Sequence, residues 1–199
     1  MSPLRKIALV AWGGLALLAL LALSWFYILE PRLNQSVTDR LGHGDYALVT
    51  SDGGTFTEDT LDGAPSAVFF GFSHCPEVCP TTLGDISVWQ DMLAEDGLGP
   101  IRTFFVTVDP ERDTPEMLGD YVSWAEGVTG VSGSREEIDK AIRAFRVYAQ
   151  KVPLKDGGYT MDHSAMVLLF DEDGRFYKPI NYQEDPERAV GKIRSLLAG

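Results

Sequence analysis

The sequence predicts an α/β domain with parallel strands, preceded by one long apolar helix. Three observations predict this class. Residues 7–29 carry no charged side chain, residues 66–72 and 102–108 are continuous apolar runs of strand length, and a segment with helical spacing lies between those two runs. A strand, a helix and a second strand of this length form a right-handed crossover, which makes the two strands parallel.

Length and composition limit the function classes. The chain has 199 residues, of which 45% are hydrophobic, and this is enough for one domain with a core and an appendage. It has 17 Lys and Arg against 29 Asp and Glu, so the formal charge is −12. That charge repels phosphate backbones, and we expect no nucleic-acid partner.

The apolar run at residues 7–29 is long enough for a helix to cross about 30 Å of hydrocarbon. Arg5 and Lys6 precede the run and Glu30 follows it. The positive-inside preference therefore keeps residues 1–6 in the cytoplasm and sends the remainder across the membrane. A cleaved signal peptide is the alternative, since residues 22–24 offer small side chains, but the run exceeds the usual signal length. We expect an uncleaved anchor.

The exported part begins with a polar tether at residues 30–44, followed by one domain at residues 45–199. After a short edge segment at residues 46–49, the run SAVFFGF at residues 66–72 has the pattern of a strand covered on both faces. Pro80 suits the first position of a helix, which should end near Gly97. Side chains at helical spacing form its mostly apolar stripe: Leu83, Ile86, Trp89, Gln90 and Leu93.

The second half of the domain continues this alternation. The strand RTFFVTV at residues 102–108 precedes a helix that Thr114 and Pro115 open and that runs to about residue 125. Ser134 and Glu137 have the spacing of a capping box at the start of another helix. Residues 165–179 indicate two strands around an Asp-Gly turn, and a last helix covers residues 186–197. This order is that of the thioredoxin fold, so we predict a thioredoxin-like fold with an N-terminal transmembrane helix.

The segment GFSHCPEVCPTTL at residues 71–83 contains both cysteines of the chain, Cys75 and Cys79. They fall in the loop and first turn between a strand and a helix, where the positive helix end favours thiolate. Their spacing allows a structural disulfide, a redox couple or two ligands of one metal ion, and geometry alone does not choose. Thiol oxidoreductases of this fold usually carry two residues between their cysteines, whereas here there are three.

A third ligand must come from one of three histidines. His43 lies in the tether, and His74 directly precedes Cys75 and should point away from it. His163, in YTMDHSAMVLLF, comes just before the predicted strand pair, and the loop at that place lies against the cysteine loop in a thioredoxin-like topology. Two thiolates and one imidazole make a soft site that suits copper, Cu(I) especially, and a structural zinc site would need a fourth ligand.

Three stretches resemble the Sco/SenC family, in its order and spacing: FFGFSHCPEVCPTTL, FFVTVDPERDTPEML and DHSAMVLLFDEDGRF. The resemblance covers the chain from about Tyr46 to its end. It implies copper binding by Cys75, Cys79 and His163. Asp109 and Asp113 also match the family. We expect them at the rim of the site beside the ligands, although their ordinary role is to cap the start of a helix.

The resemblance implies a membrane-anchored copper chaperone rather than an enzyme. It would carry Cu(I), and also Cu(II), to the copper-bearing subunit of cytochrome c oxidase, with an upstream copper donor and a thiol reductant as further partners. The domain would lie on the periplasmic side of the inner membrane, or in the mitochondrial intermembrane space. The alternative is a thiol-disulfide oxidoreductase that uses a reversible Cys75–Cys79 disulfide. A merely structural disulfide leaves His163 unexplained.

Overall fold

The computed structural model describes residues 3–25, 40–155 and 157–198, which belong to two compact units divided after residue 39. The first unit contains helix α1 (Pro3–Ser24). None of the helices in the described ranges combines the length and the apolar character that a membrane span requires. The transmembrane helix expected at residues 7–29 therefore stays a prediction. Residues 30–39, most of the expected tether, lie outside the described part.

The second unit is a mixed α/β domain around a seven-stranded sheet in the order β2-β1-β5-β4-β3-β8-β9. Strands β3, β4 and β5 are parallel neighbours, whereas β8 and β9 pair antiparallel on one side and β1 and β2 on the other. The strands of this sheet are β1 (Leu48–Thr50), β2 (Thr55–Phe56), β3 (Ser66–Gly71), β4 (Arg102–Thr107), β5 (Val128–Ser132), β8 (Val167–Phe170) and β9 (Phe176–Ile180).

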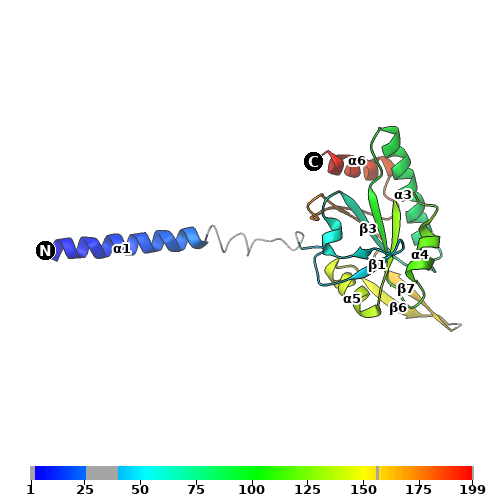
Figure 1. The fold of residues 1–199 in the computed structure, drawn as a ribbon, viewed down its shortest axis with the longest axis horizontal. Helices are drawn as coiled ribbons and strands as arrows, with labels where there is room; N and C mark the ends of the chain where they lie inside the picture. Colours follow the sequence, from blue (N-terminus) through cyan, green and yellow to red (C-terminus); the bar gives the residue numbers. More distant parts are fainter. Residues whose placement is uncertain (1–2, 26–39, 156, 199) are drawn as a thin grey trace. The chain divides into compact units, whose positions relative to one another are not determined.

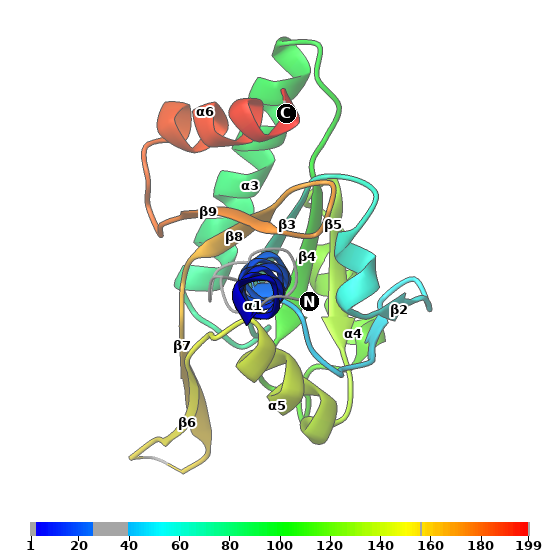
Figure 2. The ribbon, with the colours of Figure 1, turned by 90° about the vertical axis from the view of Figure 1, so that its left-hand side faces the viewer.

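Helices cover both faces of this sheet, with α3 and α6 on one face and α5 on the other (Figures 1 and 2). The helical elements of the domain are η2 (Glu58–Leu61), α3 (Val78–Glu95), α4 (Pro115–Val122), α5 (Arg135–Ala144) and α6 (Pro186–Leu197). The central strands therefore bury both faces. All six residues of β3 are buried, as its continuous apolar pattern predicts.

The order of elements confirms the predicted α/β fold, and the predicted strand pair is β8 and β9. Gly174 occupies its turn with a φ of 69°, a conformation that glycine adopts without steric cost. Strand β5 was not predicted, and two of the predicted helices differ in detail. Helix α4 ends at Val122, before residue 125, and only half of the capping box forms. Ser134 accepts a hydrogen bond from Glu137 N, but the carboxylate of Glu137 accepts one from Ala47 N.

A second, two-stranded sheet was not predicted. Strands β6 (Ala149–Pro153) and β7 (Tyr159–His163) pair only with each other, and the hairpin that they form projects from the body of the domain in both views. Its last residue is His163. The histidine thus ends a strand, whereas the sequence places it in a loop.

Residues 40–44, expected as the end of the tether, contact the domain. Gly42 N donates a hydrogen bond to Ala144 O, and Tyr46 donates its hydroxyl proton to Gly42 O.

Candidate metal centre

The cysteines lie where β3 passes into α3. The strand ends at Gly71, a turn brings Cys75 N to Phe72 O at 3.2 Å, and helix α3 then begins at Val78. Cys79 is therefore in the first turn of the helix and is fully buried, whereas Cys75 precedes the helix and is half-buried. Both are free thiols in this structure.

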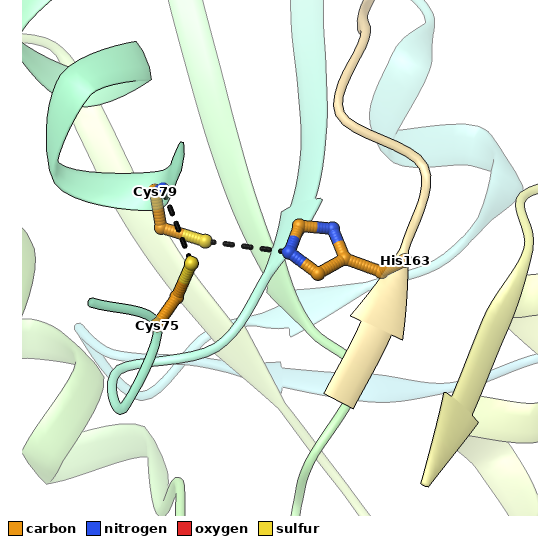
Figure 3. A group of neighbouring side chains, drawn as sticks. All are labelled: Cys75, Cys79 and His163. Atoms are coloured by element: carbon orange, nitrogen blue, oxygen red, sulfur yellow. Dashed lines mark hydrogen bonds between the residues drawn. The ribbon is translucent and has the colours of Figure 1, made fainter. Parts of the chain in front are cut away.

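The third member of the site comes from the projecting hairpin. The imidazole of His163 points at the cysteine pair, and its Nε2 lies 3.6 Å from Cys79 Sγ (Figure 3). Its Nδ1 lies 2.8 Å from the carbonyl oxygen of Ser164, which can only accept, so Nδ1 carries the ring proton. The lone pair of Nε2 then faces the sulfurs. This is how second contacts orient a histidine ligand.

Aromatic rings fix the plane of this imidazole. Phe72 meets it edge-to-face, with ring centroids 5.7 Å apart and planes at 89°, and Phe69 packs at 6.4 Å. Both phenylalanines are fully buried, Phe69 in β3 and Phe72 just after it, so the imidazole packs against rigid side chains on the side of the domain.

The three donor atoms form a group that one ion can hold. One nitrogen and two sulfurs lie within 4.8 Å of one another. Bonds of about 2.3 Å to sulfur and about 2.0 Å to nitrogen allow two ligands of one ion to be about 4 Å apart. The site needs little rearrangement to close around an ion of soft character.

The two thiols have divergent acidities. A hydrogen bond from the Cys79 side chain, helped by the backbone N–H groups of Cys79 and Glu77, lowers the pKa of Cys75 to about 4. The same hydrogen bond and burial raise the pKa of Cys79 well above its ordinary value. At neutral pH the pair therefore holds one thiolate and one thiol. Cys75 is therefore the more reactive of the two, and Cys79 would lose its proton only when an ion or a new bond replaces it.

The two aspartates lie beside the site but outside the group of donor atoms. Both are fully buried. Asp113 accepts hydrogen bonds from Ser73 N and Thr107 Oγ1 at 3.0 and 2.6 Å, and Asp109 accepts one from the hydroxyl of Tyr159 at 2.9 Å. The cap of α4 is Thr114, which accepts from Met117 N, so neither aspartate side chain caps this helix.

The other two histidines are apart from the donor group. His74 is exposed, with its Nδ1 2.9 Å from Ser73 Oγ, and His43 lies 3.6 Å from a carboxylate oxygen of Glu58. Sequence reasoning did not single out Gly71, Ser73, Arg112 or Tyr159. Their roles depend on contacts between segments far apart in the chain, and no periodic pattern indicates them.

Comparison with known proteins gives one family. The profile described as SCO1/SenC matches residues 35–198. A curated relative, the mitochondrial protein SCO2 homolog of Danio rerio, is 33% identical over 185 residues, which cover 87% of this chain and 66% of the relative. The SCO1 protein of Saccharomyces cerevisiae is 32% identical over 86% of this chain and 62% of its own length. The chain thus spans at most about two thirds of these relatives.

Solved structures agree with this result. The structure of Bradyrhizobium japonicum ScoI with copper bound has a TM-score of 0.71 and 42% sequence identity, and the match covers 79% of this chain and 99% of that one. Yeast Sco1 with copper bound gives a TM-score of 0.72 at 31% identity, over 80% of this chain and 89% of that one.

Proposed function

This chain belongs to the SCO1/SenC family, and we propose from that premise that it is a copper carrier for the assembly of cytochrome c oxidase. Copper is its cargo, held by Cys75, Cys79 and His163. The observation that carries the proposal is the convergence of two sulfurs and one imidazole nitrogen within 4.8 Å. Both solved structures described above, each more than 30% identical to this chain, have copper bound, which supports copper as the ion.

The donor set favours a transferable ion. Thiolates suit Cu(I), and the imidazole is the better donor for Cu(II), so the site serves both oxidation states. Three protein ligands leave a position open, and Cys75 is half-buried, so ligands of a partner can approach the ion from that side. We propose that an upstream donor loads the site and that the copper-bearing subunit of the oxidase takes the ion from it.

Membrane attachment is part of the proposal. The uncharged run at residues 7–29, with Arg5 and Lys6 before it, supports a single N-terminal anchor. The copper domain would then lie on the periplasmic side of the inner membrane or in the intermembrane space. There the cysteines oxidise easily, and a thiol reductant is needed to return them to the form that binds copper.

The acidity of Cys75 favours thiol reduction as a second candidate function. The thiolate of Cys75 can attack a disulfide of a partner and form a mixed disulfide. Cys79 then loses its proton and attacks the sulfur of Cys75, so that the partner leaves as a dithiol and a Cys75–Cys79 disulfide remains. Two electrons pass to the partner in this exchange, and His163 need not be a ligand.

Copper titration of the full-length protein separates the two candidates. We expect His163→Ala to weaken Cu(I) binding, measured by competition with a chromogenic chelator, and to abolish the Cu(II) form, measured by absorption and electron paramagnetic resonance. His74→Ala is the matched control, because His74 is next to Cys75 but outside the donor group. Unchanged copper binding in His163→Ala, with disulfide exchange intact, would contradict the carrier and favour the reductase.

A further inference from the structure

Residues 109–113, here called the connecting segment, join β4 to α4 and contact both halves of the candidate metal centre. Its side chains reach the hairpin that carries His163 on one side and the cysteine loop on the other. None of them is a member of the donor group. Their contacts therefore bear on where the ligands are held.

Arg112 makes the contacts to the hairpin. Its guanidinium lies over the ring of Tyr159, the first residue of β7, with 4.0 Å from Cζ to the ring centroid, and it donates a hydrogen bond to Tyr159 O at 3.2 Å. It also pairs with the carboxylate of Asp109. Arg112 thus contacts both the ring and the backbone carbonyl of Tyr159.

Asp109 contacts both Arg112 and Tyr159. Its carboxylate is fully buried, pairs with Arg112 and accepts the hydroxyl proton of Tyr159 at 2.9 Å. Arg112, Asp109 and Tyr159 therefore form a closed triangle of contacts. A buried carboxylate holds its partners firmly, because separation leaves its charge unpaired in a water-poor site.

The triangle adds to the other supports of the hairpin, which are the buried side chain of Met161 in the core and an ion pair of Lys151 with Glu111 at 3.7 Å. Within the described residues its strands pair with no other strand. A cleft of about 320 Å³ opens between the hairpin and α5, with Arg135, Ile142 and Lys151 among its lining residues. His163 is the fourth residue after Tyr159, about 13 Å along an extended strand, so fixing the start of β7 helps to fix its end.

Phe72 gives a second route between Arg112 and the ligand. Its ring lies 5.8 Å from the guanidinium carbon of Arg112 and meets the imidazole of His163 at 5.7 Å. The buried ring of Phe72 thus packs against both Arg112, which contacts the hairpin, and His163, which the hairpin carries.

Asp113 makes the contacts to the cysteine loop. It is fully buried and accepts hydrogen bonds from Ser73 N at 3.0 Å, from Ser73 Oγ and from Thr107 Oγ1 at 2.6 Å. Ser73 is two residues before Cys75. The carboxylate therefore fixes the loop at its exit from β3.

We propose that the connecting segment positions both halves of the metal centre. Arg112, with Asp109, sets His163 through the hairpin, and Asp113 independently sets Cys75 through Ser73. These are positioning residues, not ligands. The inference rests on the proposed copper site and adds to it the residues that determine how tightly an apo protein can bind the ion.

A double-mutant cycle on the full-length protein tests the histidine side. Arg112→Lys keeps a charge beside Asp109 but loses the planar group that stacks on Tyr159 and reaches its carbonyl, so the fold should survive. We expect Cu(I) affinity to fall about tenfold, as for other residues that orient a metal ligand. In a His163→Ala background the same change should have no further effect, because its route to the ion is already lost.

Arg102→Lys is the matched control. Arg102 is also a half-buried arginine that lies over an aromatic ring, Phe104 at 6.0 Å, and donates to backbone carbonyls, but it is at the opposite end of β4. It should leave copper affinity unchanged. Asp113→Asn should weaken Cu(I) binding equally with and without His163, because it acts on the cysteine side.

Hydrogen exchange of the apo protein gives a reading that does not depend on copper. We expect Arg112→Lys to accelerate amide exchange in β6 and β7, and Arg102→Lys to leave it unchanged. An equal loss of affinity from Arg112→Lys in both backgrounds, or unchanged exchange in the hairpin, would overturn the proposal. If His163→Ala alone leaves copper binding unchanged, the proposed function fails, and the exchange measurement still decides the positioning role of Arg112.

Discussion

Replacing Gly71 by alanine should displace the sulfur of Cys79. Gly71 is the last residue of β3, and a Cβ atom there would lie 2.7 Å from Cys79 Sγ and 2.8 Å from a ring carbon of Phe105. Ordinary contact of a Cβ begins at 3.4 Å, so the sulfur must move by about 0.7 Å and the ring by about 0.6 Å. The glycine therefore leaves room for the sulfur of Cys79.

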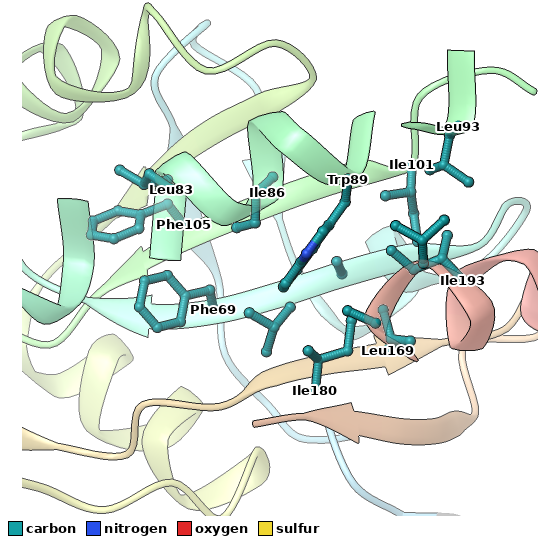
Figure 4. Packing of buried hydrophobic residues seen from close by; sticks show 14 of the residues in the cluster. Phe69, Leu83, Ile86, Trp89, Leu93, Ile101, Phe105, Leu169, Ile180 and Ile193 are labelled. Carbon is teal, nitrogen blue, oxygen red and sulfur yellow. The ribbon is translucent and has the colours of Figure 1, made fainter. Parts of the chain in front are cut away.

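The cost of this movement follows from the surroundings. Phe105 is fully buried and packs on the same face of the sheet as Phe69 and Leu83 (Figure 4). Cys79 is fixed in the first turn of α3. Neither neighbour has free space, so we expect a loss of about 1–3 kcal/mol in the free energy of unfolding, as for other overpacked cores. That corresponds to about 2–4 °C in Tm for each kcal/mol in a chain of this size.

Copper binding should suffer in addition to stability, because metal–ligand distances tolerate only about 0.2 Å. The assay is a Cu(I) competition titration of the full-length variant at a temperature where circular dichroism shows it folded. Gly84→Ala is the control. That glycine lies in α3 with no atom within 4 Å of its new Cβ, so alanine should stabilise the helix slightly and leave copper affinity unchanged. Wild-type copper affinity and wild-type Tm in Gly71→Ala would refute the reasoning.

Three further outcomes follow from the site and the sequence. The hydrogen bond from Cys79 holds the pKa of Cys75 near 4. The rate of alkylation of Cys75 by iodoacetamide should therefore stay high from neutral pH down to about pH 4 and decrease at lower pH. In Cys79→Ala, the pH at which alkylation slows should rise toward the ordinary thiol range near pH 9. An unchanged pH profile would contradict the assignment of the low pKa to the hydrogen bond from Cys79. The oxidised protein, with a Cys75–Cys79 disulfide, should not bind Cu(I), because a disulfide offers no thiolate; tight binding by that form in an anaerobic titration would disprove it. A reporter that is active only in the cytoplasm, fused after Gly199, should be inactive if residues 7–29 form an anchor with its amino end inside.

The sequence predicts those elements whose burial produces a recognisable pattern in consecutive residues. Strands β3 and β4 are covered on both faces, so their apolar runs are continuous, and the Asp-Gly pair marks the turn between β8 and β9. Strand β5 was not predicted, because Gly130 interrupts its apolar sequence pattern. That glycine is needed for a tertiary reason, since a Cβ there would lie 2.6 Å from Leu118 Cβ.

The hairpin of β6 and β7 could not be predicted for the opposite reason. Four of the five residues in β6 are exposed, so the strand has no buried face and no alternating pattern. The site shows the same division. The cysteines are found from their spacing and His163 from its place in the order of elements, whereas the contacts of Arg112 with Tyr159 span 47 residues and follow from no local rule.

One bound ion would act as a removable cross-link. Cys79 and His163 are 84 residues apart in the chain, and the described part of the segment between them includes most of α3, two further helices and four strands. An ion held by both closes that loop as a disulfide does, and binding stabilises the closed state by mass action. If copper is the cargo, loading it would stiffen the hairpin beyond what the contacts of Arg112 and Asp109 provide, and giving it up would loosen the hairpin again. A partner docking against the hairpin of the proposed carrier would then distinguish its full form from its empty form by rigidity alone, without touching the metal.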